Sequence, residues 1–313
     1  MSNRVSIDGE HILLNDEPVK IIGLRCSNAL IDDASAQLLI DNLDTFKSYG
    51  LNTVSVFLMG SRFGDVKGYR PDASLDPQYA GRLDTIIREA DSRRMIVLIG
   101  CLYWGNSRAK EDLSHWTQSE VNLAVANTVT WLWDNGHRNV IVDPDNEGMS
   151  PFDVGQMIDA GHEADPESII GFNERSEPPA NADLTFHFGA KVPVKPWFQS
   201  EGTPHNTPTE GGYWRHWCKE GGYYNYIRIG RYTEAMKTHE KEESRRDIDE
   251  YNGYMKASTW IQCGPGEGIG GPFMTPGGRS EESNAPEDVK ALAPDAGVLW
   301  WLEWVQNTYG EWS

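Results

Sequence analysis

Carboxylate side chains stand at the ends of two apolar runs that have the composition of β-strands. Glu147 comes soon after residues 140–142, and Glu201 comes soon after residues 194–199. Hydrolysis of a glycosidic bond requires two carboxyl groups, one to protonate the leaving oxygen and one to attack carbon or to activate water. Aromatic residues lie near both runs, and their rings can cover the apolar C–H faces of a sugar. These residue types point to carbohydrate chemistry.

A second Asn-Glu pair keeps the identity of the proton donor open. Asn173-Glu174 follows another short apolar run, so Glu174 competes with Glu147 for this role. The residues after Glu174 form a polar, proline-containing loop, which favours Glu147. The complete set of candidate side chains at strand ends is Arg25, Ser27, Asn28, Tyr103, Trp104, Asn106, Asp143, Asp145, Asn146, Glu147, Asn173, Glu174, His187, Glu201, His205 and Trp260.

Other common chemistries lack their sequence signals. The eight histidines form neither HxH nor HExxH, so a zinc or iron site would need scattered ligands. There is no GxSxG turn for a serine nucleophile and no GxxxxGK loop for phosphate. We therefore expect no metal and no cofactor.

The elements that must position these side chains follow from the spacing of the apolar residues. Alternation around Asp8-Gly9 predicts an N-terminal β-hairpin over residues 5–14. Helices are predicted where apolar residues recur at helical spacing, for example from Pro77 and behind the capping box that joins Thr117 to Glu120. Four strands that alternate with such helices imply parallel βαβ units, and they are predicted at residues 19–24, 51–58, 95–99 and 140–142.

The second half of the chain continues this order with shorter connections. The helices after strands five and six are expected to be short or missing. Eight strands in this order favour a closed (β/α)8 TIM barrel formed by a single domain, residues 1–313, with the active site at the carboxyl ends of the strands. An open doubly wound sheet is the alternative, but the first strand is not followed by a Gly-rich dinucleotide turn. The later strands are predicted at residues 168–171, 183–188, 194–199 and 257–261, with helices at 151–164, 228–250 and 287–308.

Several segments resemble clan A glycoside hydrolases, which include the family 5 cellulases and mannanases. Residues 139–148, Asn-Val-Ile-Val-Asp-Pro-Asp-Asn-Glu-Gly, resemble the Asn-Glu signature on strand four. Residues 195–202, Lys-Pro-Trp-Phe-Gln-Ser-Glu-Gly, resemble the strand-seven segment that carries the nucleophile. Residues 183–188 resemble the strand-six segment with its histidine, and Ser258-Thr259-Trp260 resembles the strand-eight tryptophan. The motifs are short, but they occur in the family's order and span nearly the whole chain.

The resemblance implies a role for each matching residue. Glu147 would be the general acid and base, and Glu201 the nucleophile of a double displacement with retention. Asn146 would bind the 2-hydroxyl of the sugar, and His187 would orient Glu201 or touch the substrate. Trp260 would stack under the sugar at the point of cleavage. Glu147 must then start the reaction protonated, and the negative charge of Glu201 beside it favours that form.

The chain departs from the family pattern at two places. Relatives usually carry an arginine on strand two, whereas residues 54–58 read Val-Ser-Val-Phe-Leu, and we expect Arg25 at the end of strand one to replace it. The family's His-x-Tyr reads His187-Phe188-Gly189 here. A less studied family of the clan is therefore as good a match as family 5 itself.

Further contacts with a sugar are expected outside the four motifs. Trp104 follows strand three, and His205 follows Glu201. Trp214 lies in a long aromatic stretch after strand seven, which forms either a wall of the sugar site or a loop that packs on itself.

The charge of the chain restricts its partners. With a net charge of −19 at pH 7, the protein repels phosphate backbones, so we expect a carbohydrate partner and no nucleic acid. No apolar stretch is long enough to span a bilayer, so no membrane partner is expected. The four cysteines are far apart and predict mostly free thiols. We expect a cytoplasmic protein, or a secreted one whose signal peptide has been removed.

Two other functional classes remain open on the sequence alone. One is a non-catalytic carbohydrate-binding barrel, although both glutamates are present. The other is a metal-dependent barrel hydrolase. The sequence specifies neither the sugar, nor exo or endo action, nor the oligomeric state.

Overall fold

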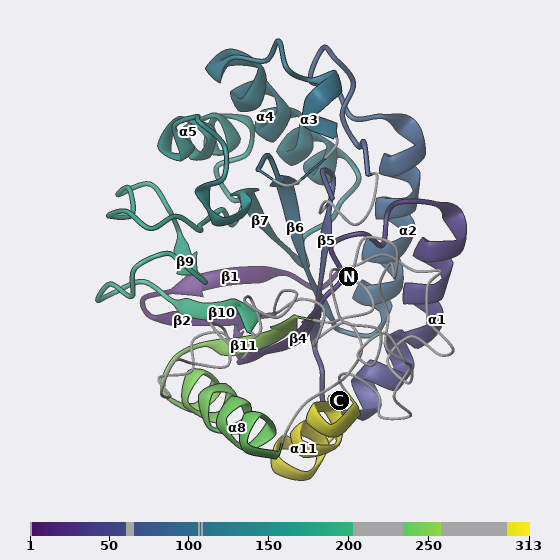
Figure 1. Cartoon of the computed structure of the whole chain (residues 1–313), viewed down its shortest axis with the longest axis vertical. Coiled ribbons are helices and arrows are strands. Elements are labelled where there is room, and N and C mark those ends of the chain that lie inside the picture. Colours follow the sequence, from purple (N-terminus) through teal and green to yellow (C-terminus); the bar gives the residue numbers. More distant parts are fainter. Residues whose placement is uncertain (1, 61–65, 106, 108, 203–233, 258–298) are drawn as a thin grey trace, which may run out of the picture.

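Eight parallel strands form a ring at the centre of the molecule (Figure 1). The computed structural model describes residues 2–60, 66–105, 107, 109–202, 234–257 and 299–313. The ring closes between the first and last strands of the sheet, where Val142 forms a parallel bridge with Ile170 and its N–H donates to Ile169 O at 2.9 Å. The predicted (β/α)8 barrel is confirmed. The order around the ring is β7 (Val140–Asp145), β6 (Ile96–Leu102), β5 (Thr53–Phe57), β4 (Ile21–Arg25), β11 (Gly253–Ala257), β10 (Trp197–Gly202), β9 (Leu184–Phe186) and β8 (Gly171–Phe172).

The predicted N-terminal hairpin is present and packs against one end of the barrel. β1 (Val5–Asp8), β2 (His11–Leu14) and β3 (Glu17–Pro18) form a small antiparallel sheet. Its apolar side chains Val5, Ile12 and Leu14 join a buried cluster with residues from the beginnings of the barrel strands, including Ile21 and Ile96. The hairpin therefore covers the amino ends of the strands and leaves the carboxyl ends for the site.

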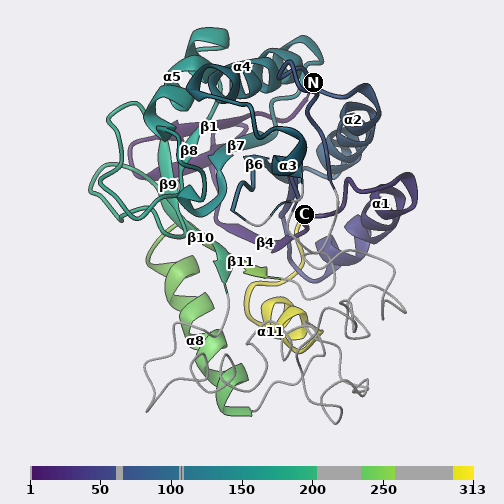
Figure 2. The ribbon, with the colours of Figure 1, turned by 45° about the horizontal axis from the view of Figure 1, so that its top comes forward.

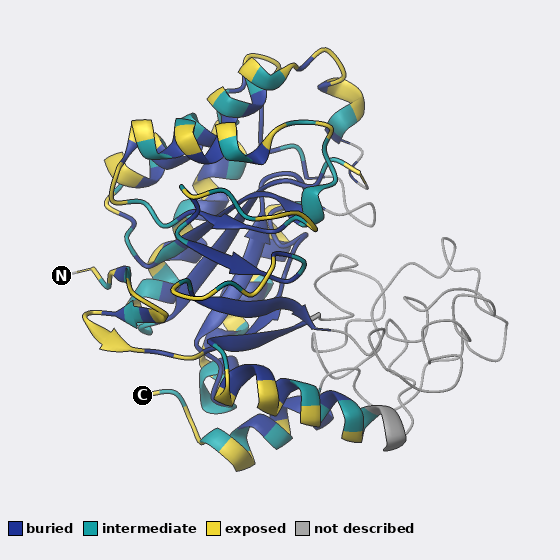
Figure 3. Ribbon diagram, turned by 90° about the vertical axis from the view of Figure 1, so that its left-hand side faces the viewer, coloured by how far each residue is buried: buried dark blue, intermediate teal, exposed yellow. Residues whose placement is uncertain are grey.

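The helices surround the barrel and present their polar faces outward (Figure 3). Capping side chains define several of their starts: Asp32 accepts from Ser35 N, Asp76 accepts from Gln78 N, and Thr117 with Glu120 forms the predicted capping box. No helix in the described ranges is long and apolar enough to cross a membrane. The helices are α1 (Asp33–Ser48), α2 (Pro77–Ser92), α3 (Ala109–Asp112), α4 (Gln118–Asp134), η1 (Asn146–Gly148), α5 (Val154–Ala164), α8 (Glu234–Asp249) and α11 (Leu299–Tyr309).

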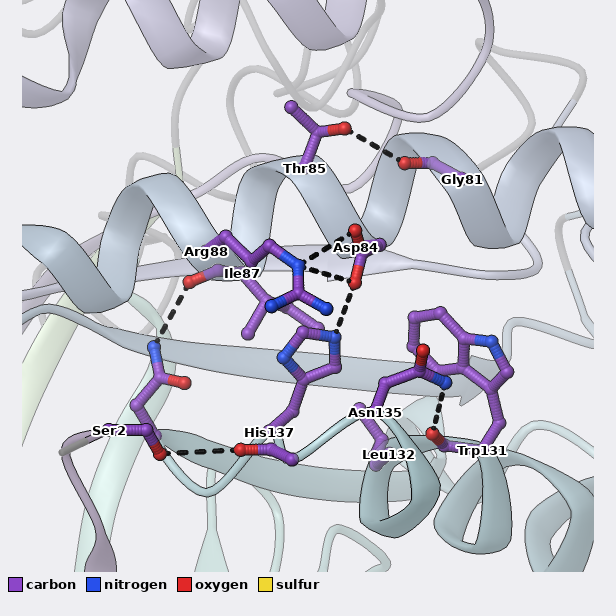
Figure 4. A network of polar contacts seen from close by, with 12 residues as sticks. Ser2, Gly81, Asp84, Thr85, Ile87, Arg88, Trp131, Leu132, Asn135 and His137 are labelled. Atoms are coloured by element: carbon purple, nitrogen blue, oxygen red, sulfur yellow. Dashed lines mark hydrogen bonds and ion pairs between the residues drawn. The ribbon is translucent and has the colours of Figure 1, made fainter.

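A polar network fastens α2 to the turn between α4 and β7 (Figure 4). Asp84 accepts from Arg88 at 2.9 Å and lies 3.0 Å from Nε2 of His137. Burial lowers the pKa of His137, although Asp84 opposes this shift. The network lies near the amino end of β7, whereas Glu147 follows the carboxyl end of the same strand.

The outer layer lacks helices where the sequence predicted short or missing ones. Residues 173–183 and 187–196 are fully described and contain no helix. The chain returns from β8 to β9 and from β9 to β10 through loops, while α8 lies beside β10 and β11 (Figure 2). The prediction for these two connections is confirmed.

The structure corrects the position of strand eight. The sequence predicted it at residues 257–261, but the strand runs over Gly253–Ala257 and pairs in parallel with β4. The apolar pattern missed this strand because it contains the charged Lys256. Lys256 is fully buried and forms an ion pair with Glu240, 2.7 Å away. Strand seven also extends further than predicted, to Gly202, so that Glu201 is part of the strand and does not follow it.

Candidate active site

Two carboxyl groups and one imidazole meet at the carboxyl end of the barrel. Glu147 lies in η1 directly after β7, and Glu201 lies in β10. One carboxylate oxygen of each and one ring nitrogen of His187 lie within 4.8 Å of one another. The barrel therefore brings together three side chains that the sequence predicted from separate strand ends.

Two of these residues have backbone conformations that few side chains adopt. The φ angles of Glu147 and His187 are 59° and 51°, both in the left-handed region. The residue after Glu147 is Gly148, at φ 58°, where a Cβ atom would lie 2.4 Å from Cγ of Glu174. Such conformations persist only where the surrounding fold imposes them, and they are concentrated at functional sites.

Arg25 supplies positive charge beneath the pair. Its fully buried guanidinium donates from Nη2 to Asn146 Oδ1 at 2.6 Å, and the same nitrogen lies 3.3 Å from Oε2 of Glu201. It also lies over the ring of Phe57, 4.7 Å from the centroid. Burial by itself lowers the pKa of Arg25, but nearby negative groups, Glu201 first, raise it overall. The guanidinium thus remains charged and favours the ionised form of Glu201.

The amide of Asn146 is oriented by this contact. Because its Oδ1 accepts from Arg25, its Nδ2 points away from the guanidinium. Among the described residues, this buried nitrogen has no hydrogen-bond partner. A buried donor without a partner is costly, so a ligand that accepts from it gains a favourable contact.

The environment of Glu147 keeps its carboxyl group protonated. Burial raises its pKa well above the usual range, and the charge of Glu201 and a hydrogen bond between the two carboxyls raise it further. Arg25 and Arg175 oppose this shift without cancelling it. The two glutamates therefore differ in protonation, which is the condition for one to donate a proton and the other to attack.

His187 lies next to Glu147 and is almost completely buried. Its Nε2 is 3.8 Å from Oε1 of Glu147, and its Nδ1 is 2.6 Å from Oε1 of Gln199. The ring stacks on Phe188 at 3.9 Å. Sequence reasoning missed Gln199, although its place two residues before Glu201 on the same strand was a usable signal.

A layer of carboxyl and amide groups lies around the start of η1. Burial raises the pKa of Asp143 and of Asp145 to about 7 each. Asp143 accepts from Asn173 Nδ2 at 3.1 Å, and Asp145 accepts from the backbone N–H of Ser150 at 2.9 Å. The rival Glu174 packs against Gly148 and is not part of the cluster of Glu147, His187 and Glu201.

The remaining predicted contacts divide into two groups. Trp104 is described and is partly exposed; its ring stacks on Trp116 at 6.3 Å and meets Phe152 edge-on at 5.2 Å. This places it in an aromatic cluster at the barrel mouth. Trp260, His205 and Trp214, as well as Asn106, lie outside the described residues.

The cluster of Glu147, His187 and Glu201 also has the composition of a metal site. Carboxylate oxygens and an imidazole nitrogen are common zinc ligands. However, a buried cation already lies against Glu201, because the Arg25 guanidinium is 3.3 Å from Oε2. A divalent ion at this position would be repelled by Arg25 and would need the Glu147 proton to leave.

Several solved structures that superpose on this chain are glycoside hydrolases. A β-1,4-D-mannanase from Cryptopygus antarcticus superposes with a TM-score of 0.54 at 13% identity, covering 89% of this chain and 98% of its own. A β-mannanase from the blue mussel Mytilus edulis gives 0.54 at 12% identity, covering 84% and 95%. A family 5 glycoside hydrolase from Bacteroides vulgatus gives 0.55 at 16%, covering 87% and 65%.

Sequence comparison finds no relative of this chain among family models or curated proteins. At these identities the structural likeness shows a shared fold. The chain has the barrel fold of the family 5 glycoside hydrolases.

Proposed function

We propose that the protein is a retaining β-glycosidase in which Glu147 is the acid and base and Glu201 the nucleophile. The observation that carries this proposal is the unequal carboxyl pair at the barrel mouth. Glu147 is held protonated, while Arg25 supports the ionised form of Glu201. One oxygen of each carboxyl group lies within 4.8 Å of the other, and this short approach is consistent with the roughly 5–5.5 Å spacing of the carboxyl groups in retaining enzymes.

The reaction follows from these protonation states. Glu201 attacks the anomeric carbon while the Glu147 proton passes to the leaving oxygen, which gives a glycosyl ester on Glu201 and a carboxylate on Glu147. The carboxylate then takes a proton from water, and the hydroxide attacks the anomeric carbon and releases Glu201. In this mechanism the Asn146 Nδ2, which has no partner among the described residues, would donate to the sugar 2-hydroxyl.

The substrate that we propose to test first is a β-mannan. The shared fold supports this choice, since two of the similar structures are named as β-mannanases. Trp104, Trp214, Trp260 and His205 remain the proposed contacts for the sugar.

The test compares the wild type with Glu147→Gln and Glu201→Gln on aryl β-glycosides and β-mannan. We expect each variant to lose hydrolysis by a factor of about 10³ or more while its unfolding transition is retained. Asp84→Asn is the matched control, because it changes a carboxylate at the other end of the barrel. Azide should restore turnover to Glu201→Gly and to Glu147→Ala. Near-normal turnover by Glu201→Gln would overturn the assignment.

A metal-dependent hydrolase is the second candidate, and the cluster of Glu147, His187 and Glu201 is the observation that favours it. Metal analysis of the purified protein separates the two functions. Stoichiometric zinc with loss of activity on chelation supports the metal-dependent reaction, whereas full activity after chelation supports the carboxyl pair.

A non-catalytic sugar-binding barrel would bind the oligosaccharide equally well with and without Glu201→Gln and would hydrolyse nothing.

A further inference from the structure

Gln199 lies at an irregularity in the pairing of β10, the strand that carries Glu201. The pairing of β10 with β11 shifts within this stretch, because Gln199 faces Tyr254 whereas Gly202 faces Lys256. Three steps along β10 thus correspond to two along β11, which is a β-bulge. Bulges free a backbone group from the ladder, and here the N–H of Glu201 donates to Oε1 of Gln199 at 3.1 Å. The Gln199 side chain therefore supports the backbone of Glu201 at the bulge.

This contact identifies the Gln199 atom. A backbone N–H can only donate, so the side-chain atom that it meets is the amide oxygen and not the amide nitrogen. The same oxygen is 2.6 Å from Nδ1 of His187. Since an amide oxygen only accepts, Nδ1 of His187 carries a proton. In the neutral imidazole the other nitrogen, Nε2, is then unprotonated.

The unprotonated nitrogen, Nε2, faces Glu147, the proposed acid. Nε2 of His187 is 3.8 Å from Oε1 of Glu147. Three features keep the ring in this orientation. The backbone of His187 is left-handed, its N–H donates a hydrogen bond to Phe198 O at 3.1 Å, and its ring stacks on Phe188. Were the proton on Nε2 instead, the ring would donate toward Glu147 and stabilise its ionised form.

We propose that Gln199 is a positioning residue that selects the Nδ1–H tautomer of His187, so that the ring does not donate toward Glu147 and the acid retains its proton. This inference rests on the proposed function of Glu147. It assigns a role to a residue that acts through His187, and it links the bulge beneath Glu201 to the protonation of Glu147.

Among the described residues, charged groups other than His187 also act on Glu147. Glu201 on β10 favours the protonated acid, whereas Arg25 on β4 and Arg175 after β8 favour the ionised acid. A Gln199 variant replaces none of these three side chains, and the His187 signals distinguish a change of tautomer from a shift of the Glu201 backbone that Gln199 supports.

Nitrogen NMR of the histidine side chains in the wild-type protein tests the tautomer directly. We expect His187, assigned by the loss of its signals in His187→Asn, to show a protonated Nδ1 and an unprotonated Nε2 near pH 7. In Gln199→Met the two nitrogens should become more alike, because the acceptor that favours the proton on Nδ1 is lost. His137, whose partner is Asp84, is the internal control and should keep its signals. A wild-type His187 with its proton on Nε2 would overturn the inference, and this result does not depend on whether Gln199→Met folds.

The pH profile of hydrolysis is the second readout. In Gln199→Glu a carboxylate at Nδ1 favours the imidazolium, whose Nε2–H then stabilises ionised Glu147. The alkaline limb of kcat/KM should move down by about one pH unit, whereas a merely structural defect would lower the whole profile without moving it. An unmoved limb in a folded, active Gln199→Glu contradicts the inference while leaving the carboxyl pair intact. A protein with the expected tautomer but no hydrolysis contradicts the proposed function instead.

Discussion

Replacement of Arg25 by methionine removes a buried cation that donates to Asn146 and pairs with Glu201. Methionine keeps an unbranched apolar stem but has no donor, so the Glu201 carboxylate and the Asn146 Oδ1 both lose the guanidinium. The side chains of Arg25 and Glu201 are 0% and 2% exposed, so water cannot replace the lost charge. Removal of one partner of a buried ion pair costs about 3–5 kcal/mol.

Two measurements follow from this magnitude. Denaturant unfolding near neutral pH should show a free energy of unfolding lower by about 3–5 kcal/mol. In catalysis, an ionised nucleophile that loses about 3–4 kcal/mol of stabilisation should lower kcat/KM by roughly 10²–10³-fold. The stability cost should shrink in acid, because protonation of Glu201 removes the stranded negative charge.

Arg93→Met is the matched control. Arg93 pairs with Asp44 and Glu89, whose side chains are 74% and 43% exposed, so its loss should cost only about 0–1 kcal/mol and leave kcat/KM unchanged. An Arg25→Met variant that loses the same stability in acid as near neutral pH, or that keeps wild-type kcat/KM, would contradict this role of Arg25.

Two further predictions concern the groups around the carboxyl pair. The pKa of Asp143 is about 7 in the folded protein against a usual 3.8, so its stabilising contribution is complete below about pH 4 and is lost as the pH rises through about 7. Between about pH 4 and 7 the free energy of unfolding of Asp143→Asn, measured with urea, should therefore rise relative to that of the wild type, by up to about 4 kcal/mol. If the free energies of unfolding of the two proteins changed in parallel with pH, this explanation would be excluded. In Gly202→Ala a new Cβ would lie 1.9 Å from Cζ of Tyr254, so we expect a loss of about 1–3 kcal/mol and a lower kcat. Gly81→Ala, in α2 with nothing within 4 Å of the new atom, should instead add roughly 0.5–1 kcal/mol and keep activity.

The sequence alone determined the barrel, its N-terminal hairpin and the two connections without helices. These features depend on local patterns: alternation in strands, helical spacing behind caps, and loops too short or too polar to form a helix. The same patterns placed Glu147, Asn146, His187 and Arg25 at strand ends, and the carboxyl ends of parallel strands in a barrel meet at one mouth. Their proximity could therefore be predicted, although the protonation state of each could not.

Only the tertiary structure decided what each group meets. Strand eight was misplaced because Lys256 is charged, and a buried lysine becomes acceptable only with Glu240 from a distant helix against it. The bulge in β10 depends on how that strand pairs with β11, and it alone gives Gln199 its contacts with the Glu201 backbone and with His187. The unequal protonation of the two glutamates likewise depends on burial and on charges from other strands. Local periodicity specifies which elements form, whereas desolvation and ion pairing arise between residues far apart in the chain, and these interactions set the chemistry of the site.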